Sequence, residues 1–162
     1  MKASWTLSLL FLLACRGSLE PGAPFFHGLR SGQAPEEVQG LLGLGPEQWH
    51  PVDDALLPRG RTLGFRMVRV EIKTFAHQDC PGRLVLYFFN DRLVRARFHP
   101  ADFPRFQKVL AEKEDLSLAA GTTLDPEDGL RIRVLRDQAG GSYVVWEDPN
   151  LLAQWDALNK RR

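Results

Sequence analysis

The sequence predicts a single α+β domain, in which short helices pack on an antiparallel sheet. Its 162 residues suit one hydrophobic core, since single domains usually use about 100 to 200 residues. Segments that alternate with period two and segments with helical spacing follow one another, and Gly, Pro and Asn separate them. The apolar content of 44% and the charged content of 25% argue against a collagen-like, wholly disordered or polytopic membrane chain. With 21 basic and 20 acidic side chains, the chain has no overall charge that would attract nucleic acid.

The first residues predict an export signal. Lys2 precedes an apolar run from about Leu7 to Ala14. The run is too short for a bilayer, whose hydrocarbon core of about 30 Å needs roughly 20 helical residues, but it has the length of a secretory signal. Residues 1–14 are therefore the predicted signal peptide.

The end of this signal resembles the lipobox of bacterial lipoproteins, in which a cysteine is lipidated and becomes the first residue of the mature chain. Here the sequence is Leu-Leu-Ala followed by Cys15. Cys15 is therefore the predicted lipidation site, through which the protein would be attached to a membrane. An ordinary secretory signal or a short N-terminal helix is the alternative. Residues 15–24 contain Gly, Pro and Ser without periodicity, which predicts a tether to a domain spanning residues 25–162.

The domain is predicted to begin with two short helices. In residues 35–42 a proline occupies the first helical position, acidic residues follow in the first turn, and Gly43 stands just past the end. The apolar stripe of this helix is Val38, Leu41 and Leu42. A second short turn or helix is predicted over residues 46–49. Phe25 and Phe26 lie at the predicted start of the folded domain and are expected to pack into its hydrophobic core.

A long strand is predicted next, over residues 62–75. Phe65 and Met67 have one parity, whereas Val68 and the apolar residues after it have the other. The change of parity predicts a β-bulge near Met67-Val68.

Residues 83–89 and 93–98 predict a β-hairpin around a three-residue loop, 90–92. The loop length decides the register, because a slip of one residue exchanges the two faces of a strand. A two-residue loop would mix arginines into both faces. The three-residue loop gives one wholly apolar face, made of Leu84, Leu86, Phe88, Val94, Ala96 and Phe98.

The second half predicts an added helix, a second hairpin and a C-terminal helix. Residues 101–116 form the amphipathic helix, with an apolar face of Phe103, Phe106, Val109 and Leu110. Residues 130–134 and 142–147 alternate on either side of a Gly-rich turn, which predicts the hairpin. Asp148 is the predicted cap of the terminal helix. The apolar face of that helix is Leu151, Leu152, Trp155 and Leu158.

The residues give little support for catalysis. There is no nucleophile elbow, phosphate-binding Gly-rich loop or zinc-binding HExxH motif in the sequence. His77 and Cys80 are too few ligands for a closed zinc site, and Cys80 is expected to be a loop thiol. Glu147 and Asp148 are adjacent on a strand, so they point to opposite faces and do not readily form an acid–base pair. No cofactor, metal or small-molecule substrate is therefore expected. The alternative is a soluble secreted hydrolase or metal-dependent enzyme that uses His77, Cys80 or Glu147.

The second face of the 83–98 hairpin predicts a binding surface. The three-residue loop places Val85, Tyr87 and Phe89 beside Leu93, Arg95 and Arg97. Aromatic and Arg side chains are enriched at interface hot spots, so the candidate partner-binding residues are Tyr87, Phe89, Arg95 and Arg97. The two arginines also suit anionic lipid headgroups, and as exposed side chains they are expected to contribute little to folding. In the alternative, the 101–116 helix or the terminal helix covers this face and the arginines are paired at its rim.

Several segments together resemble the SmpA/OmlA lipoproteins of bacterial outer membranes. They are the lipobox-like signal, the segment GQAPEEVQGLLG, a tryptophan, a long strand and the hairpin LVLYFFNDRLVRARF. The resemblance covers about residues 25–100. The residues that match the family's motif of a glycine and a helix ending in V…LLG are Gly32, Val38, Leu41, Leu42 and Gly43. Gln33 and Ala34 depart from that motif, in which a hydrophobic residue and a threonine follow the glycine.

The resemblance implies two short helices against an antiparallel sheet, and a non-catalytic accessory role at the complex that inserts β-barrel proteins. The predicted function is therefore a lipid-anchored binding or scaffold module at the periplasmic face of the outer membrane, with an envelope protein as its partner. A soluble secreted or periplasmic protein is the alternative location.

Overall fold

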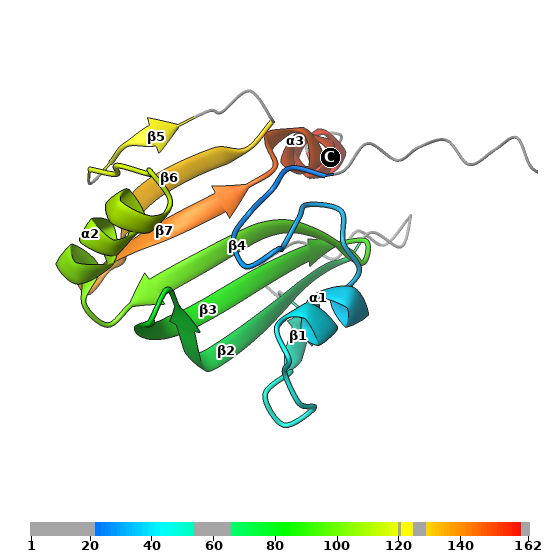
Figure 1. The fold of residues 1–162 in the computed structure, drawn as a ribbon. Helices are drawn as coiled ribbons and strands as arrows, with labels where there is room; N and C mark the ends of the chain where they lie inside the picture. Colours follow the sequence, from blue (N-terminus) through cyan, green and yellow to red (C-terminus); the bar gives the residue numbers. More distant parts are fainter. Residues whose placement is uncertain (1–21, 54–65, 120, 125–128, 160–162) are drawn as a thin grey trace, which may run out of the picture.

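The computed structural model describes residues 22–53, 66–119, 121–124 and 129–159. These residues form three helices and one seven-stranded antiparallel sheet, which confirms the predicted α+β class (Figure 1). The helices are α1 (Pro35–Leu41), α2 (Phe103–Lys113) and α3 (Pro149–Asn159). The strands are β1 (Pro51–Asp53), β2 (Met67–His77), β3 (Cys80–Phe89), β4 (Arg92–Pro100), β5 (Thr123–Leu124), β6 (Arg131–Arg136) and β7 (Ser142–Glu147). The predicted signal peptide and Cys15 lie outside the described residues.

The strand order in the sheet is β1-β2-β3-β4-β7-β6-β5. Strands β2, β3 and β4 form a meander, and the hairpin of β6 and β7 joins it because β7 pairs with β4. This hairpin confirms the one predicted from residues 130–134 and 142–147. The edge strands β1 and β5 were not predicted, because segments of three and two residues are too short to show an alternating pattern.

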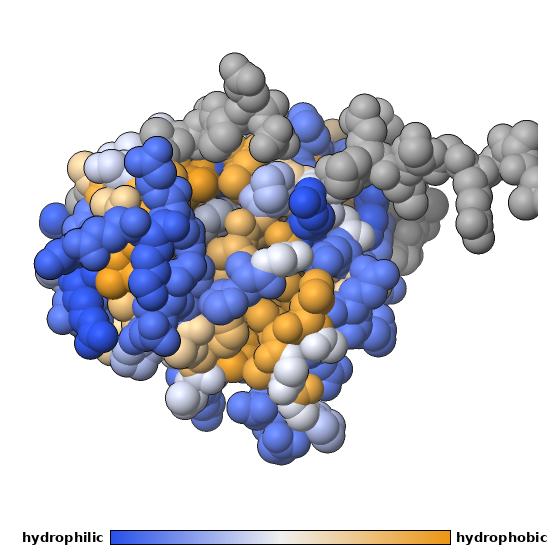
Figure 2. Space-filling model, in the orientation of Figure 1, coloured by the Kyte–Doolittle hydropathy of each residue, from blue (hydrophilic) through white to orange (hydrophobic). Residues whose placement is uncertain are grey.

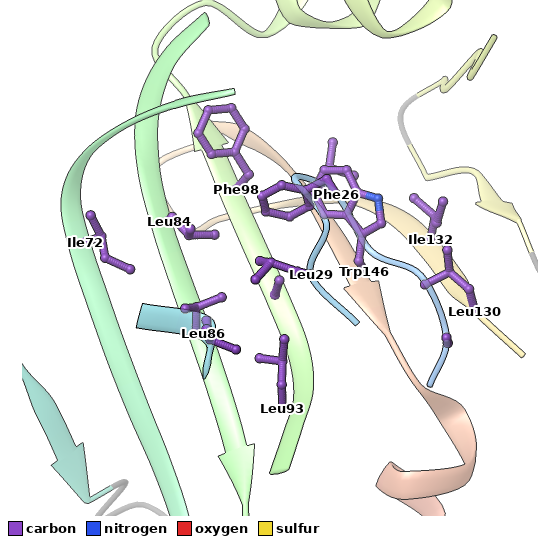
Figure 3. Packing of buried hydrophobic residues seen from close by; sticks show 14 of the residues in the cluster. Phe26, Leu29, Ile72, Leu84, Leu86, Leu93, Phe98, Leu130, Ile132 and Trp146 are labelled. Carbon is purple, nitrogen blue, oxygen red and sulfur yellow. The ribbon is translucent and has the colours of Figure 1, made fainter. Parts of the chain in front are cut away.

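One face of the sheet holds the main hydrophobic core. Leu86, Ala96, Trp146 and Ile132 lie opposite one another on four adjacent strands, and each is buried. The segments that cover this face include the N-terminal segment, which contributes Phe26 and Leu29, α1, which contributes Val38, and α2, which contributes Phe106 and Leu110. In the middle of the cluster the Phe26 and Trp146 rings meet with centroids 4.5 Å apart (Figure 3). The predicted role of Phe26 as a core plug is confirmed.

The N-terminal segment, residues 22–34, is fixed to the sheet and to α3 by hydrogen bonds. The backbone N–H of Gly32 donates to the carbonyl of Leu93, and the N–H of Leu93 donates to the carbonyl of Gln33, both at 2.8 Å. The buried Ser31 hydroxyl donates to Oδ2 of Asp148 at 2.7 Å. The other oxygen of Asp148 accepts N–H groups from the first turn of α3, which confirms the predicted cap.

Helix α1 follows the predicted pattern only in part. Pro35 begins the helix, Gly43 after its end has a φ of 62°, and Val38 is fully buried. Leu41 was predicted in the apolar stripe but is 53% exposed, so the side of α1 that packs is narrower than expected. Figure 2 shows apolar surface between α1 and α2 on this side of the molecule. The short turn or helix predicted over residues 46–49 is a turn, over residues 46–48.

Helix α2 confirms the amphipathic helix predicted over residues 101–116, although it is shorter at both ends. The Asp102 side chain accepts a hydrogen bond from the N–H of Arg105 and so caps the helix. Phe106 and Leu110 are buried, and Phe103 and Val109 pack against the same core at its margin.

Helix α3 packs on the opposite face of the sheet, at one end. Leu152, Leu151 and Trp155 contact a small second core made of Met67, Phe89 and Val94. Both faces of the sheet are therefore covered at this end. The side chain of Leu158, predicted on the apolar face of this helix, is outside the described part of the chain.

The predicted bulge near Met67-Val68 is wrong. Met67 pairs with Phe89 and Val68 with Phe88 in one unbroken register, and the shift lies instead between Ile72 and Phe75. Met67 and Val68 are both apolar because each faces a different core, Met67 the one under α3 and Val68 the main one. Two buried faces abolish the alternation from which the bulge was inferred.

The β3–β4 hairpin has a two-residue turn in place of the predicted three-residue loop. Phe89 pairs with Arg92, and Asn90 and Asp91 have φ values of 47° and 57°, as a type I′ turn requires. A bulge then restores the predicted pairing further from the turn, where Tyr87 lies opposite Arg95. Because of the bulge, Leu93 takes the place predicted for Val94 in the main core.

Candidate binding face

The candidate site is the part of the second sheet face that α3 leaves uncovered. One row of residues crosses five strands here. Arg69, Tyr87, Arg95, Glu147 and Arg131 lie opposite one another from β2 to β6. The charged and aromatic residues of this row and of the next two rows form a surface that we call the arginine face. Its members are Arg69, Glu71, Arg83, Tyr87, Arg95, Arg97, His99, Arg131, Arg133, Tyr143 and Glu147.

Glu147 is the centre of the arginine face. Its side chain is fully buried, yet both oxygens have cationic partners. Arg95 Nε lies 2.8 Å from one oxygen, and Arg131 Nε and Arg133 Nη2 lie 2.7 and 2.8 Å from the other. Burying a carboxylate without partners costs several kcal/mol. The three arginines offset this cost, so a charged glutamate can be buried on this face of the sheet.

The electrostatics of the cluster agree with its geometry. Burial by itself would raise the pKa of Glu147, but Arg95, Arg133 and Arg131 together hold that pKa below its ordinary value. Burial also lowers the pKa of Arg95, while the charge of Glu147 acts in the opposite direction. Glu147 is therefore a carboxylate held in the charged state.

Arg97 has no comparable partner among the residues that the structure describes. Its guanidinium lies 4.6 Å from the centre of the Tyr87 ring, and that of Arg95 lies 5.8 Å from the same ring. No carboxylate of the described residues forms an ion pair with Arg97. The Nε atom of Arg97 is buried and lacks an acceptor within the described part of the chain, and the same holds for the Nε atom of Arg133.

The structure brings together three of the four predicted partner-binding residues. Tyr87, Arg95 and Arg97 are half-buried and lie side by side on the arginine face. The fourth, Phe89, has the predicted orientation but is only 2% exposed, because Trp155 of α3 covers it. Phe89 is thus a core residue in this structure, and its assignment as a surface contact is corrected.

The role expected of Arg95 in folding also changes. The sequence predicts an exposed arginine that contributes little to stability, whereas Arg95 neutralises a buried carboxylate. The alternative in which the terminal helix covers part of the face and arginines pair at its rim is therefore partly borne out. The outcome for Arg97 differs, because no described acid pairs with it.

Arg131, Arg133 and Glu147 were not predicted as members of this site. Arg131 and Arg133 alternate with Leu130 and Ile132 in the sequence, which identifies them as one polar strand face. The pairing of β7 with β4 joins segments about fifty residues apart, and nothing local indicates it. The sequence therefore indicates a polar face on the 83–98 hairpin and another on the strand with Arg131 and Arg133, but not that the two lie side by side in one sheet.

A second polar cluster lies on the other side of the sheet. His77, 1% exposed, lies among aromatic rings that include Phe26 and Phe106, and its Nε2 is 3.3 Å from Oε1 of Glu114. The Gln78 amide donates to the same oxygen at 2.8 Å. The contact with His77 is the main cause that holds the pKa of Glu114 below its ordinary value.

The residues considered for catalysis do not meet in one place. Cys80 begins β3 opposite His77 and is 2% exposed, so the predicted loop thiol is a buried strand residue. Glu147 lies on the other sheet face and is neutralised by arginines. Among the described residues there is no group of three or more His, Cys, Asp or Glu side chains placed to hold a metal ion.

Within the described residues no helix is long and apolar enough to cross a bilayer. Comparisons with protein-family models, with curated proteins and with solved structures gave no match. The resemblance to the SmpA/OmlA lipoproteins accordingly stays a prediction from the sequence motifs.

Proposed function

We propose that this protein is a lipid-anchored binding module of the bacterial envelope, and that the arginine face is the surface that holds its partner. The attachment to the membrane rests on the lipobox-like segment ending at Cys15. The binding role rests on one structural observation, the half-buried Arg97, which has no described acid as a partner and lies against Tyr87.

This observation favours binding because desolvated arginines and tyrosines are the side chains that contribute most at protein interfaces. Tyr87 supports the guanidinium of Arg97 from one side, so the group has little conformational freedom left to lose on binding. Salt bridges among the described residues use Arg95, Arg131 and Arg133 but do not include Arg97.

Site-specific photo-crosslinking in native membranes tests the proposal. A photoreactive amino acid replaces His99, which is half-buried on the arginine face, or Lys108, which is exposed on α2 on the other side of the sheet. We expect a discrete protein adduct from position 99 only. The adduct should be lost with Arg97→Ala and retained with Arg105→Ala, an exposed arginine of α2.

Adducts of the same size and yield from positions 99 and 108, or no adduct from position 99, would contradict the proposal. In the first case the contacts are unspecific, and in the second the partner does not reach the arginine face. The unfolding midpoints of both arginine variants serve as the folding control, because neither side chain pairs with a described acid.

A further inference from the structure

The arginine face concentrates positive charge that the chain as a whole lacks. It has six arginines, Arg69, Arg83, Arg95, Arg97, Arg131 and Arg133, against the two glutamates Glu71 and Glu147. The entire chain has a net charge of only +1, so the remaining residues are acidic on balance. A surface of this sign attracts anionic groups, and the rest of the molecule repels them.

The domain itself shows which anionic group these arginines accept. Three of them already bind the carboxylate of Glu147 at 2.7 to 2.8 Å. Arg97 is not among the arginines that pair with this carboxylate. Arg97 and the buried Nε of Arg133 remain without acceptors among the described residues.

The spacing of Arg97 and Arg133 suits an extended chain. The two residues lie in one row, on either side of Val145. Two interstrand spacings separate them, which corresponds to about 10 Å. An extended polypeptide covers this distance in about three residues, so a short segment with acidic side chains reaches both guanidinium groups.

The position of α3 favours a narrow ligand over a flat one. The helix packs on the same face through Leu152 and Trp155, beside the arginine face. A helix with its side chains is about 10 Å across, so α3 forms a ridge next to the sheet. A bilayer surface that rests on this ridge is held away from half-buried groups such as Arg95, whereas an extended segment fits beside it.

We infer that the arginine face binds an extended acidic segment of the partner protein, with a carboxylate of that segment paired with Arg97. This inference depends on the proposed function, because it names the chemistry by which the same face recognises its partner. Arg133 provides the second contact across Val145. Charge-assisted hydrogen bonds between guanidinium and carboxylate are the strong interactions of this class.

A direct binding measurement tests the inference. The full chain with Cys15→Ser, which lacks the predicted acceptor of the lipid, is titrated into a fluorescent short polyglutamate peptide, and the anisotropy is recorded. We expect saturable binding that weakens about tenfold or more with Arg97→Ala, the loss of one charge-assisted pair, and changes less than about twofold with Arg105→Ala. Raising the salt from about 0.05 M to about 0.5 M should weaken binding, because the Debye length shortens. A polylysine peptide should not bind.

Three results would overturn the inference. They are equal affinity for polyglutamate and polylysine, an affinity that Arg97→Ala leaves unchanged, and binding to phosphatidylglycerol vesicles without binding to the peptide. The last result identifies a lipid surface as the ligand. If the peptide does not bind but position 99 still gives a crosslink, only the inference of an acidic segment is refuted. If position 99 gives no crosslink, the proposed function itself is refuted.

Discussion

Glu147 shows, at the scale of one residue, how the proposed binding surface also takes part in the structure of the domain. The sequence indicates that its side chain points away from that of Asp148, and the structure agrees, since Asp148 caps α3 while Glu147 faces the arginines. What the sequence does not indicate is its burial, because a strand-end glutamate is usually solvated. Three arginines, from the strands on either side of β7, make that burial possible.

Glu147→Gln is expected to destabilise the fold by about 2 to 4 kcal/mol, because three guanidinium groups lose the charge that balances them. Glu71→Gln is the matched control. The pair that it forms with Arg83 is partly exposed to solvent, so its loss should cost less than about 1 kcal/mol. Urea unfolding of both variants measures the difference, and equal losses would show that the buried cluster adds no stability.

Acid should weaken the fold in a way that depends on Glu147. Its folded-state pKa is depressed below the ordinary value of 4.5, so the unfolded state binds the proton more readily. The stabilisation is fully present above that value and is lost as the pH falls through the folded-state pKa. We expect stability to decline below about pH 4.5, and less steeply with Glu147→Gln. Parallel pH profiles for the two proteins would contradict this account.

The β3–β4 hairpin shows, at the scale of an element, what the sequence can and cannot determine. The alternation correctly predicts Tyr87 opposite Arg95 and the burial of Leu86. It does not determine the turn, because a two-residue turn with a bulge and a three-residue loop give the same register beyond the bulge. The sequence also does not show that α3 covers the opposite face. Its pattern predicts an exposed Phe89, whereas Trp155, which is distant in the sequence, packs on that ring.

Phe88→Ala tests which face of β3 lies in the main core. Phe88 is fully buried in the main core against β2, so truncation should destabilise the domain by about 3 to 5 kcal/mol. Leu41→Ala is the control, because Leu41 is 53% exposed and should cost less than about 1 kcal/mol. Denaturant unfolding with an unchanged m-value measures both. A loss below about 1 kcal/mol for Phe88→Ala would refute its place in the core.

At the scale of the whole molecule, membrane attachment and folding are expected to be independent. Cys15→Ser should abolish membrane association, since a buried lipid chain contributes about 0.8 kcal/mol per CH₂. The fold should not change, because residues from 22 onward provide the described hydrophobic core. Sedimentation with membranes after a high-salt wash and the unfolding midpoint measure the two properties. A Ser variant that still sediments would exclude the anchor.

The hydrogen bonds of the N-terminal segment have a mechanical consequence. Tension applied on the N-terminal side of Gly22 reaches the domain through residues 22–34. The two backbone bonds with Leu93 and the bond from Ser31 to Asp148 lie along that path. The load therefore passes into the central strand β4 and the start of α3 at once. A protein pulled between a membrane and a bound partner would transmit the force through its sheet, and Ser31→Ala would lower the force at which the first segment detaches.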